Sequence, residues 1–334
     1  MELSALGEFG LIDLIKEATA AEQVSTLSSQ ALQRLRIGIG DDAAAWEGST
    51  ALQLATTDSL VEDVHFSFSV CSWGDLGHKS LAVNLSDIAA MGGHPLYALV
   101  ALSCPGDVDS DSVLAYLRDM LSLATRHGVI IAGGNLASAP QVCSTVTVFG
   151  EVREDAVMKR SAAHAGQQII VTGSLGASGA AVSALTSEAG SHVPLPLLHA
   201  LCRPYPRVKE AQILAGEGVT CAIDISDGLV ADLSHLCTAS GVSALVHAAD
   251  VPVHPSCRDI TTDPLAHALW GGEDYELLFA AEPAQVQLLR EVVPGPLSVI
   301  GEFVPSAGTH EVTVVDSEGN PISPVRAGWD HFGR

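Results

Sequence analysis

Basic residues are scarce in this sequence: 16 Lys and Arg stand against 39 Asp and Glu, which gives a formal net charge of −23. Such a charge argues against nucleic acid and anionic membrane surfaces as partners. No apolar run approaches the roughly 20 residues of a membrane span, and the first residues lack the basic and then hydrophobic regions of a secretory signal. Seven cysteines include no C-x-x-C pair, so the spacing of a zinc site is missing. We therefore expect a cytoplasmic protein with no nucleic-acid and no membrane partner.

The length of 334 residues exceeds one ordinary hydrophobic core, which predicts two domains. Strand-like segments alternate with helical ones, including a helix from about Asp109 to His127 and a buried strand over Val129–Asn135 that runs into a glycine turn. This alternation predicts an α/β protein, although the unequal spacing leaves open whether the sheets are parallel. Charge rises and apolar periodicity lapses around Arg153–Gly166. We therefore predict an N-terminal α/β domain at 1–155 and a C-terminal α/β domain at 156–334.

The stretch Leu81–Gly93 is predicted to be the second half of a helix that begins near Ser72 or Trp73 and ends at two glycines. One stripe of this helix is polar and comprises Ser80, Asn84 and Asp87. A solvated helix face explains such a stripe without any function. The opposite side, however, is rich in Ala, Val and Met, which predicts a helix that is buried nearly all round. A carboxylate in such surroundings needs a partner, and a metal ion is one candidate.

Acidic residues recur at the predicted ends of elements, each beside Gly, Ser or Thr: Asp41, Asp42, Asp58, Asp87, Asp224 and Asp227. Taken singly, each is explained by a helix cap or an Asx turn. If they converge, their repulsion requires counter-ions, and Mg²⁺ suits carboxylates together with substrate phosphates. Phosphoryl transfer is the chemistry that such a site serves, because it depends mainly on positioning and charge neutralisation. The glycine run Gly173–Gly179 lacks the Gly-Lys-Ser/Thr ending of a P-loop, so it predicts only a tight strand-to-helix turn.

Over essentially its whole length the chain resembles the thiamine-monophosphate kinase family, in the superfamily of aminoimidazole ribonucleotide synthetase and selenophosphate synthetase. The motifs that carry the resemblance occur in the family's order: Gly7–Phe9, Gly38–Asp42, Thr57–Asp58, Asn84–Gly92, Ile223–Leu229 and Gly271–Glu276. The resemblance implies an aminoimidazole ribonucleotide synthetase-like two-domain architecture, with the N-terminal domain pairing across a homodimer. It also implies Mg²⁺-dependent transfer of the ATP γ-phosphate to thiamine monophosphate. We expect direct in-line transfer without a phosphoenzyme, because the acceptor phosphate has a second pKa of about 6 and needs no general base.

The resemblance also implies roles for individual residues. The residues matched to magnesium ligands are Asp42, Thr56, Thr57, Asp58, Asp87, Asn135, Asp224 and Asp227. Of these, the ones expected to be catalytic are Asp42, Asp58, Asp87 and Asp227. Contacts to ATP are implied for Gly134, Asn135, Arg160 and Ser226. The thiamine-phosphate side is implied for His65, Glu273 and Trp329, which are otherwise explained as a loop His, a turn carboxylate and a packed tail aromatic.

One position departs from the family pattern. Where the family has Gly-Gly-Asp-Thr, this chain has Gly133–Leu136 with Asn135 at the third place, and an amide adds no charge to a Mg²⁺ site. The number of magnesium ions therefore stays open. A non-catalytic nucleotide-binding or metal-binding homologue is the alternative that Asn135 favours. Selenophosphate synthetase would be expected to carry an N-terminal Cys, and the hydrogenase-maturation relative a C-terminal one; neither occurs here.

Overall fold

The structure, a computed structural model, describes residues 2–23, 29–39, 43–187 and 193–322. The chain divides into two compact units: unit 1 comprises Met1–Ile88 and Gly93–Glu154, and unit 2 comprises Ala89–Gly92 and Asp155–Arg334. Each unit is built from helices and sheets, so the predicted mixed α/β class is confirmed. Within the described ranges, no helix has both the length and the apolar character that crossing a bilayer requires.

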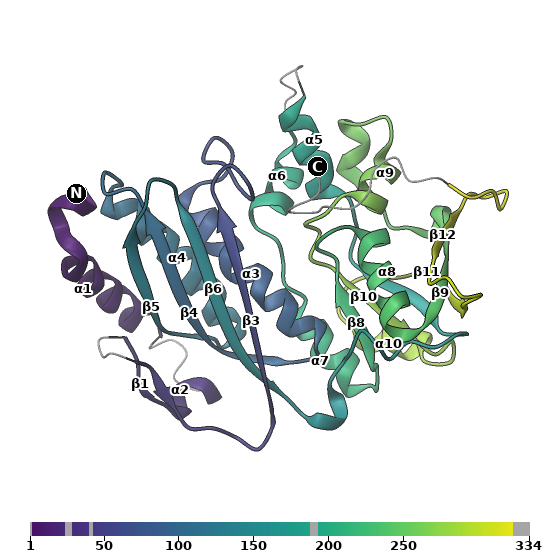
Figure 1. Ribbon diagram of the computed structural model, residues 1–334, viewed down its shortest axis with the longest axis horizontal. Coiled ribbons are helices and arrows are strands. Elements are labelled where there is room, and N and C mark those ends of the chain that lie inside the picture. Colours follow the sequence, from purple (N-terminus) through teal and green to yellow (C-terminus); the bar gives the residue numbers. More distant parts are fainter. Residues whose placement is uncertain (1, 24–28, 40–42, 188–192, 323–334) are drawn as a thin grey trace. The chain divides into compact units, whose positions relative to one another are not determined.

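Unit 1 is organised around a four-stranded sheet with the order β3-β6-β4-β5, in which only β4 and β5 run parallel (Figure 1). Its elements are α1 (Leu3–Gln23), α2 (Gln30–Arg34), β1 (Leu35–Ile37), β2 (Ala45–Trp46), β3 (Leu52–Val61), α3 (Trp73–Ala90), β4 (His94–Cys104), α4 (Ser110–His127), β5 (Ile130–Ser138) and β6 (Cys143–Val152). The helices predicted near Trp73 and after Asp109 are confirmed, and Asp109 is the N-cap of α4.

Helices α3 and α4 pack together and cover one face of this sheet. A Cβ atom on Gly77 of α3 would lie 1.9 Å from the carbonyl oxygen of Tyr116 in α4, so only glycine permits this approach. The hydroxyl of Tyr116 in turn lies 2.7 Å from that of Ser144 in β6. Ser80 and Asn84 are 1% and 0% exposed, and both donate to backbone carbonyls of their own helix. The predicted polar stripe therefore lies inside unit 1, and its interpretation as a solvated helix face is wrong.

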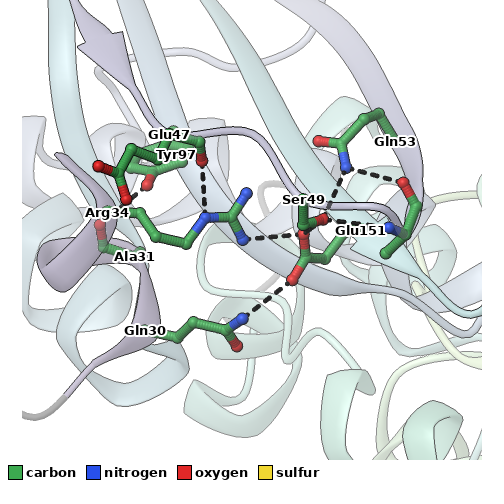
Figure 2. A network of polar contacts seen from close by, with 9 residues as sticks. Gln30, Ala31, Arg34, Glu47, Ser49, Gln53, Tyr97 and Glu151 are labelled. Atoms are coloured by element: carbon green, nitrogen blue, oxygen red, sulfur yellow. Dashed lines mark hydrogen bonds and ion pairs between the residues drawn. The ribbon is translucent and has the colours of Figure 1, made fainter.

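The other face of the sheet is partly covered by α2 and the β1-β2 ribbon. Trp46 stacks on Tyr97 with ring centroids 4.4 Å apart. Figure 2 shows the polar network beside this stack, in which Arg34 of α2 meets Glu151 of β6 at 2.9 Å. Ser49 donates to the same carboxylate at 2.6 Å. Through these bonds to Glu151, the network attaches α2 and the residues around Ser49, which precede β3, to the sheet.

Unit 2 contains a six-stranded sheet with the order β12-β9-β11-β7-β10-β8, which is antiparallel except for the pair β9 and β12. Its elements are β7 (Gln168–Thr172), α5 (Ala177–Thr186), α6 (Leu195–Cys202), α7 (Val208–Gly216), β8 (Cys221–Asp224), α8 (Leu229–Ser240), β9 (Val242–His247), α9 (Pro264–Trp270), β10 (Leu277–Ala281), α10 (Val286–Val292), β11 (Leu297–Pro305) and β12 (Val312–Val315), with short 3-10 helices at Glu154–Ala156, Ala248–Asp250 and Pro255–Asp259. Its core packs α8 and α9 against the sheet through fully buried side chains such as Leu233, Leu269 and Ile223.

Two local predictions in unit 1 are wrong. Asp58 does not end its strand, because the ladder between β3 and β6 continues three residues further, to the pair Val61 and Cys143. The glycines of β5 do not form a turn either, because β5 remains paired with β4 as far as Ser138. A Cβ on Gly134 would lie 2.0 Å from the carbonyl oxygen of Val100, so this glycine permits a close approach of two strands.

Candidate active site with an acidic cluster in each unit

In unit 1, β3 and α3 bring two carboxyl groups together. Side chains alternate along a strand, so Thr56 and Asp58 both point to the face that α3 covers. The hydroxyl of Thr56 donates to Asp87 Oδ2 at 2.5 Å. Burial, the charge of Asp87 and a hydrogen bond between the two carboxyl groups together raise the pKa of Asp58 to about 6. Such a pair either shares a proton or binds a cation.

Two predicted magnesium ligands lie on the opposite face of the sheet from this acidic pair. Thr57 follows Thr56 along the strand, and its hydroxyl lies 2.9 Å from that of Thr147 on the exposed face. Asn135 shares a cross-strand row with Ala101, Thr145 and Ser59, whereas Asp58 shares the neighbouring row with Gly134. The structure therefore does not bring Thr57 or Asn135 together with Asp87, and their role as ligands stays a prediction.

His65 lies in the turn after β3. Its Nδ1 accepts the backbone N–H of Val61 at 3.1 Å, so in the neutral ring the proton is on Nε2. The carbonyl of His65 accepts from Nζ of Lys79, a fully buried side chain of α3, at 3.2 Å. Asp63 in this turn has a left-handed φ of 60°. Two further predicted site residues, Asp42 and Trp329, lie outside the described residues.

In unit 2, a second acidic cluster surrounds the turn between β8 and α8. Asp224 ends β8 and is 3% exposed, and Asp227 lies in the turn. Asp232, in the first turn of α8, accepts three backbone N–H groups through one carboxylate oxygen, each at 3.1 Å, from Ser226, Asp227 and Gly228. Burial and, to a smaller extent, the charges of Asp224 and Asp227 raise the pKa of Asp232 to about 7, although the backbone N–H groups that it accepts lower it. The turn is therefore held from within by a carboxylate.

The sequence reasoning missed Asp232 and its neighbour His235. One ligand atom from each of these two residues lies within 4.8 Å of the other and of one from Asp227. The available signal was an Asp at the third or fourth position of a helix that follows an Asp-Gly turn, which is the position from which a carboxylate reaches the free N–H groups of the helix end.

Glycines from three segments of unit 2, namely the turn itself, the stretch Gly271–Gly272 and helix α5, approach one another closely here. Gly272 has no space for a side chain, because its Cβ would lie 2.5 Å from the carbonyl oxygen of Ser226. Gly179 approaches Gly271 in the same way, since a Cβ on Gly179 would lie 2.9 Å from the Cα of Gly271. The next residue after Gly272, the predicted site residue Glu273, donates its N–H to Ser226 O at 2.7 Å. Glu273 and Ser226 are therefore brought together with Asp224 and Asp227.

Arg160 lies beside the beginning of β8, away from the turn that follows this strand. Its backbone carbonyl accepts from the thiol of Cys221, the first residue of β8, and from the hydroxyl of Ser240 at 2.8 Å. Asp224 is the last residue of the same strand, roughly 10 Å along it. The side chain of Arg160 is exposed, and its contact with ATP stays a prediction.

Residues 40–152 match the family model of the AIR synthase related protein N-terminal domain, and residues 164–313 match that of the AIR synthase related protein C-terminal domain. The chain is thus a two-domain protein of the AIR synthase-related class. Hydrogenase maturation protein HypE in complex with ATP shares the fold, with a TM-score of 0.73 at 21% identity over 86% of this chain and 89% of that one.

Relatives with higher identity define the family more narrowly. The thiamine-monophosphate kinase of Aquifex aeolicus is 32% identical over 99% of this chain and 100% of its own length. That of Bacillus subtilis is 32% identical over 89% of this chain and 93% of its own. A solved structure of AaThiL complexed with AMPPCP and TMP has a TM-score of 0.74 at 32% identity and covers 99% of both chains. The chain belongs to the thiamine-monophosphate kinase family.

Proposed function

We propose that this protein transfers the γ-phosphate of ATP to thiamine monophosphate and forms thiamine diphosphate. The observation that carries the proposal is the match over 99% of both chains to a relative that binds AMPPCP and TMP. AMPPCP is an ATP analogue with an uncleavable β–γ linkage, so the relative holds a donor analogue together with a phosphate acceptor. The two acidic clusters of this chain fit such a reaction, because transfer between phosphates requires positioning and charge neutralisation above all.

Magnesium is part of the proposal. In unit 1 the hydroxyl of Thr56 and the carboxyl groups of Asp58 and Asp87 are hard oxygen donors, and the raised pKa of Asp58 reflects its burial and the neighbouring charge of Asp87. In unit 2, Asp224 and Asp227 offer the same donor chemistry. These residues therefore fit Mg²⁺, which supplies charge neutralisation to the phosphates when it is bound.

The residues of the chain orient the reactants and do not form a covalent intermediate. The acceptor phosphate is mostly ionised near neutral pH, since its second pKa is about 6, so no side chain has to remove a proton. The turn held by Asp232 fixes Ser226 and Asp227. Contacts to ATP are proposed for Ser226, Arg160 and the Gly134–Asn135 stretch, and contacts to the thiamine-phosphate side for His65, Glu273 and Trp329. Transfer is then direct and in line.

The active form is proposed to be a homodimer in the cytoplasm, paired through unit 1. Support comes from the uncovered part of the sheet, where the hydroxyls of Thr57 and Ser59 pair with those of Thr147 and Thr145 on an exposed face. Sedimentation equilibrium would give twice the monomer mass of 34.5 kDa if the chain pairs in this way. A monomeric mass at micromolar concentration would contradict the dimer without touching the reaction.

A substrate panel tests the proposed reaction against the other enzymes of the superfamily. The protein is incubated with ATP and Mg²⁺ and with either thiamine monophosphate, selenide or the precursor of aminoimidazole ribonucleotide, and the consumption of ATP is measured. We expect ATP to be consumed with thiamine monophosphate. Consumption of ATP only with one of the other two would refute the proposal, and binding of ATP without turnover on any of them would favour a non-catalytic homologue.

A further inference from the structure

The segment Gly271–Glu276 has an unusual backbone. Glu273 and Tyr275 have left-handed φ angles of 65° and 51°, and in the described part of the chain only one other non-glycine residue, Asp63, has a positive φ. Side chains are disfavoured in this region, so such residues persist only where their surroundings hold them, and they cluster at functional sites. The strained residues flank Asp274 on both sides.

Backbone hydrogen bonds join this segment to the turn that carries Asp227. Glu273 N–H donates to Ser226 O at 2.7 Å, and Tyr275 N–H donates to Ile225 O at 2.8 Å. Ile225 N–H in turn donates to Glu276 O at 2.8 Å. A movement of the segment would therefore move the turn that precedes α8.

Asp274 connects the same segment to a helix end. Both of its carboxyl oxygens accept the backbone N–H of Gly176, at 3.0 and 2.9 Å. Gly176 is the N-cap of α5 and provides no side-chain cap of its own. The N-terminus of a helix after a glycine run is where phosphate groups commonly bind. Here that position is taken by a carboxyl group of the chain itself, which gives the Gly173–Gly179 run a structural partner in place of a ligand.

We propose that Asp274 is a positioning residue. Its hydrogen bonds to Gly176, which we call the clasp, attach the strained segment Gly271–Glu276 to the N-terminus of α5 and so hold Glu273 and the adjoining turn in place for the substrate. This inference rests on the proposed function of the site. The clasp is separate from the fold of the unit, because Glu276 at the end of the segment is held independently. Its carboxylate accepts two bonds from Arg207, at 2.6 and 2.5 Å, and one from Thr172 at 2.5 Å.

The charge of Asp274 is not what the clasp requires. Burial raises the pKa of Asp274 well above its ordinary value, although the N–H of Gly176 lowers it, and the charges of Glu276 and Glu273 raise it further. An asparagine, which is neutral and offers one acceptor oxygen in the same place, is therefore expected to replace it. Rescue by asparagine separates the hydrogen bond from the charge.

The experiment compares Asp274→Ala and Asp274→Asn with a matched control, Asp316→Ala. Asp316 also accepts two backbone N–H groups, from Glu318 and Asn320, but in the turn after β12. Two quantities are measured: KM for thiamine monophosphate and for ATP, and the hydrogen–deuterium exchange of peptides that cover residues 271–279. The exchange measurement needs no catalytic activity.

We expect Asp274→Ala to raise KM for thiamine monophosphate about tenfold and to raise KM for ATP as well, because the same segment holds Ser226, the proposed ATP contact. The amides of the 271–279 peptides should exchange about tenfold faster. Asp274→Asn should return both KM and the exchange rate most of the way to the parental values. Asp316→Ala should change neither KM nor the exchange of the 271–279 peptides. Parental exchange in Asp274→Ala would overturn the clasp, and so would parental KM values for both substrates. If the parent protein fails to phosphorylate thiamine monophosphate, the proposed function is wrong, and faster exchange in Asp274→Ala would still establish the clasp.

Discussion

Removal of the Glu151 carboxylate should destabilise unit 1 by a predictable amount. Glu151 and Arg34 form an ion pair whose side chains are only 10% and 11% exposed, and Ser49 and Gln30 donate to the same carboxylate (Figure 2). Breaking a buried pair from one side costs about 3–5 kcal/mol, because the remaining charge is left buried without its partner. Arg34 keeps a second bond, at 2.8 Å to the carbonyl oxygen of Glu47, so the lower end of that range applies. Glu151→Ala should therefore lower the free energy of unfolding by about 3 kcal/mol.

The assay is urea unfolding followed by tryptophan fluorescence, to which Trp46 contributes from its stack on Tyr97 beside the network. The matched control is Glu47→Gln, which breaks the pair between Glu47 and Arg36, whose side chains are 59% and 55% exposed. An exposed pair contributes at most about 1 kcal/mol, so the control should stay close to the parent. The reasoning would be refuted if the two variants lost equal free energies of unfolding, or if Glu151→Ala lowered the free energy of unfolding by less than about 1 kcal/mol.

The stabilisation by Glu151 should also depend on pH. Burial raises the pKa of Glu151, but the hydroxyl of Ser49 and the guanidinium of Arg34 together outweigh it, so the pKa lies below its ordinary value of 4.5. A lowered pKa contributes stability that is fully present above the unfolded-state pKa and is lost as the pH falls through the folded-state pKa. The difference between the parent and Glu151→Gln should therefore be constant near neutrality and shrink below pH 4.5. A difference that grows on acidification would contradict this assignment.

Asp87→Asn should lower kcat by about a hundredfold or more with the fold intact, measured against the exposed Asp111→Asn as a control; kinetics equal to the control would remove Asp87 from the site. If Asn135 is a magnesium ligand as predicted, Asn135→Asp should lower the Mg²⁺ concentration for half-maximal rate by about tenfold, equivalent to 1.4 kcal/mol. An unchanged concentration would agree instead with its place on the sheet face opposite Asp58 and would remove Asn135 from the metal site. Gly134→Ala should destabilise unit 1 by several kcal/mol, because the new methyl group meets the carbonyl oxygen of Val100 at 2.0 Å; a parental melting temperature would contradict the close strand contact.

Helices α3 and α4 could be predicted from local pattern, and so could the environment of Asp87. The second half of the helix that ends at Ala90 is mostly apolar, and its termination by two glycines is a local signal. The prediction that Asp87 sits in an apolar setting follows from the same pattern and agrees with the burial of its neighbours Asn84 and Ile88. Its contact with Thr56, 31 residues earlier, is a tertiary fact that no local pattern contains.

The errors in the strands have a different cause. Hydroxyls and a carboxylate in Thr56–Ser59 are typical of a strand end, but ten consecutive cross-strand pairs with β6 carry β3 on to Val61. The same ladder decides on which face Thr57 and Asn135 lie, since a shift of one residue reverses a side chain. Motif order alone therefore indicated the family correctly but could not separate residues on the two faces of a sheet.

The central claim is tested most directly by following the transferred phosphate. The protein is incubated with ATP labelled at the γ-phosphate, Mg²⁺ and thiamine monophosphate, and the label is located among thiamine diphosphate, inorganic phosphate and protein. We predict that the label enters thiamine diphosphate in a one-to-one ratio with ADP, that none is bound to protein, and that omission of Mg²⁺ abolishes the transfer. Label found in inorganic phosphate or on the protein, with no labelled thiamine diphosphate, would contradict the account.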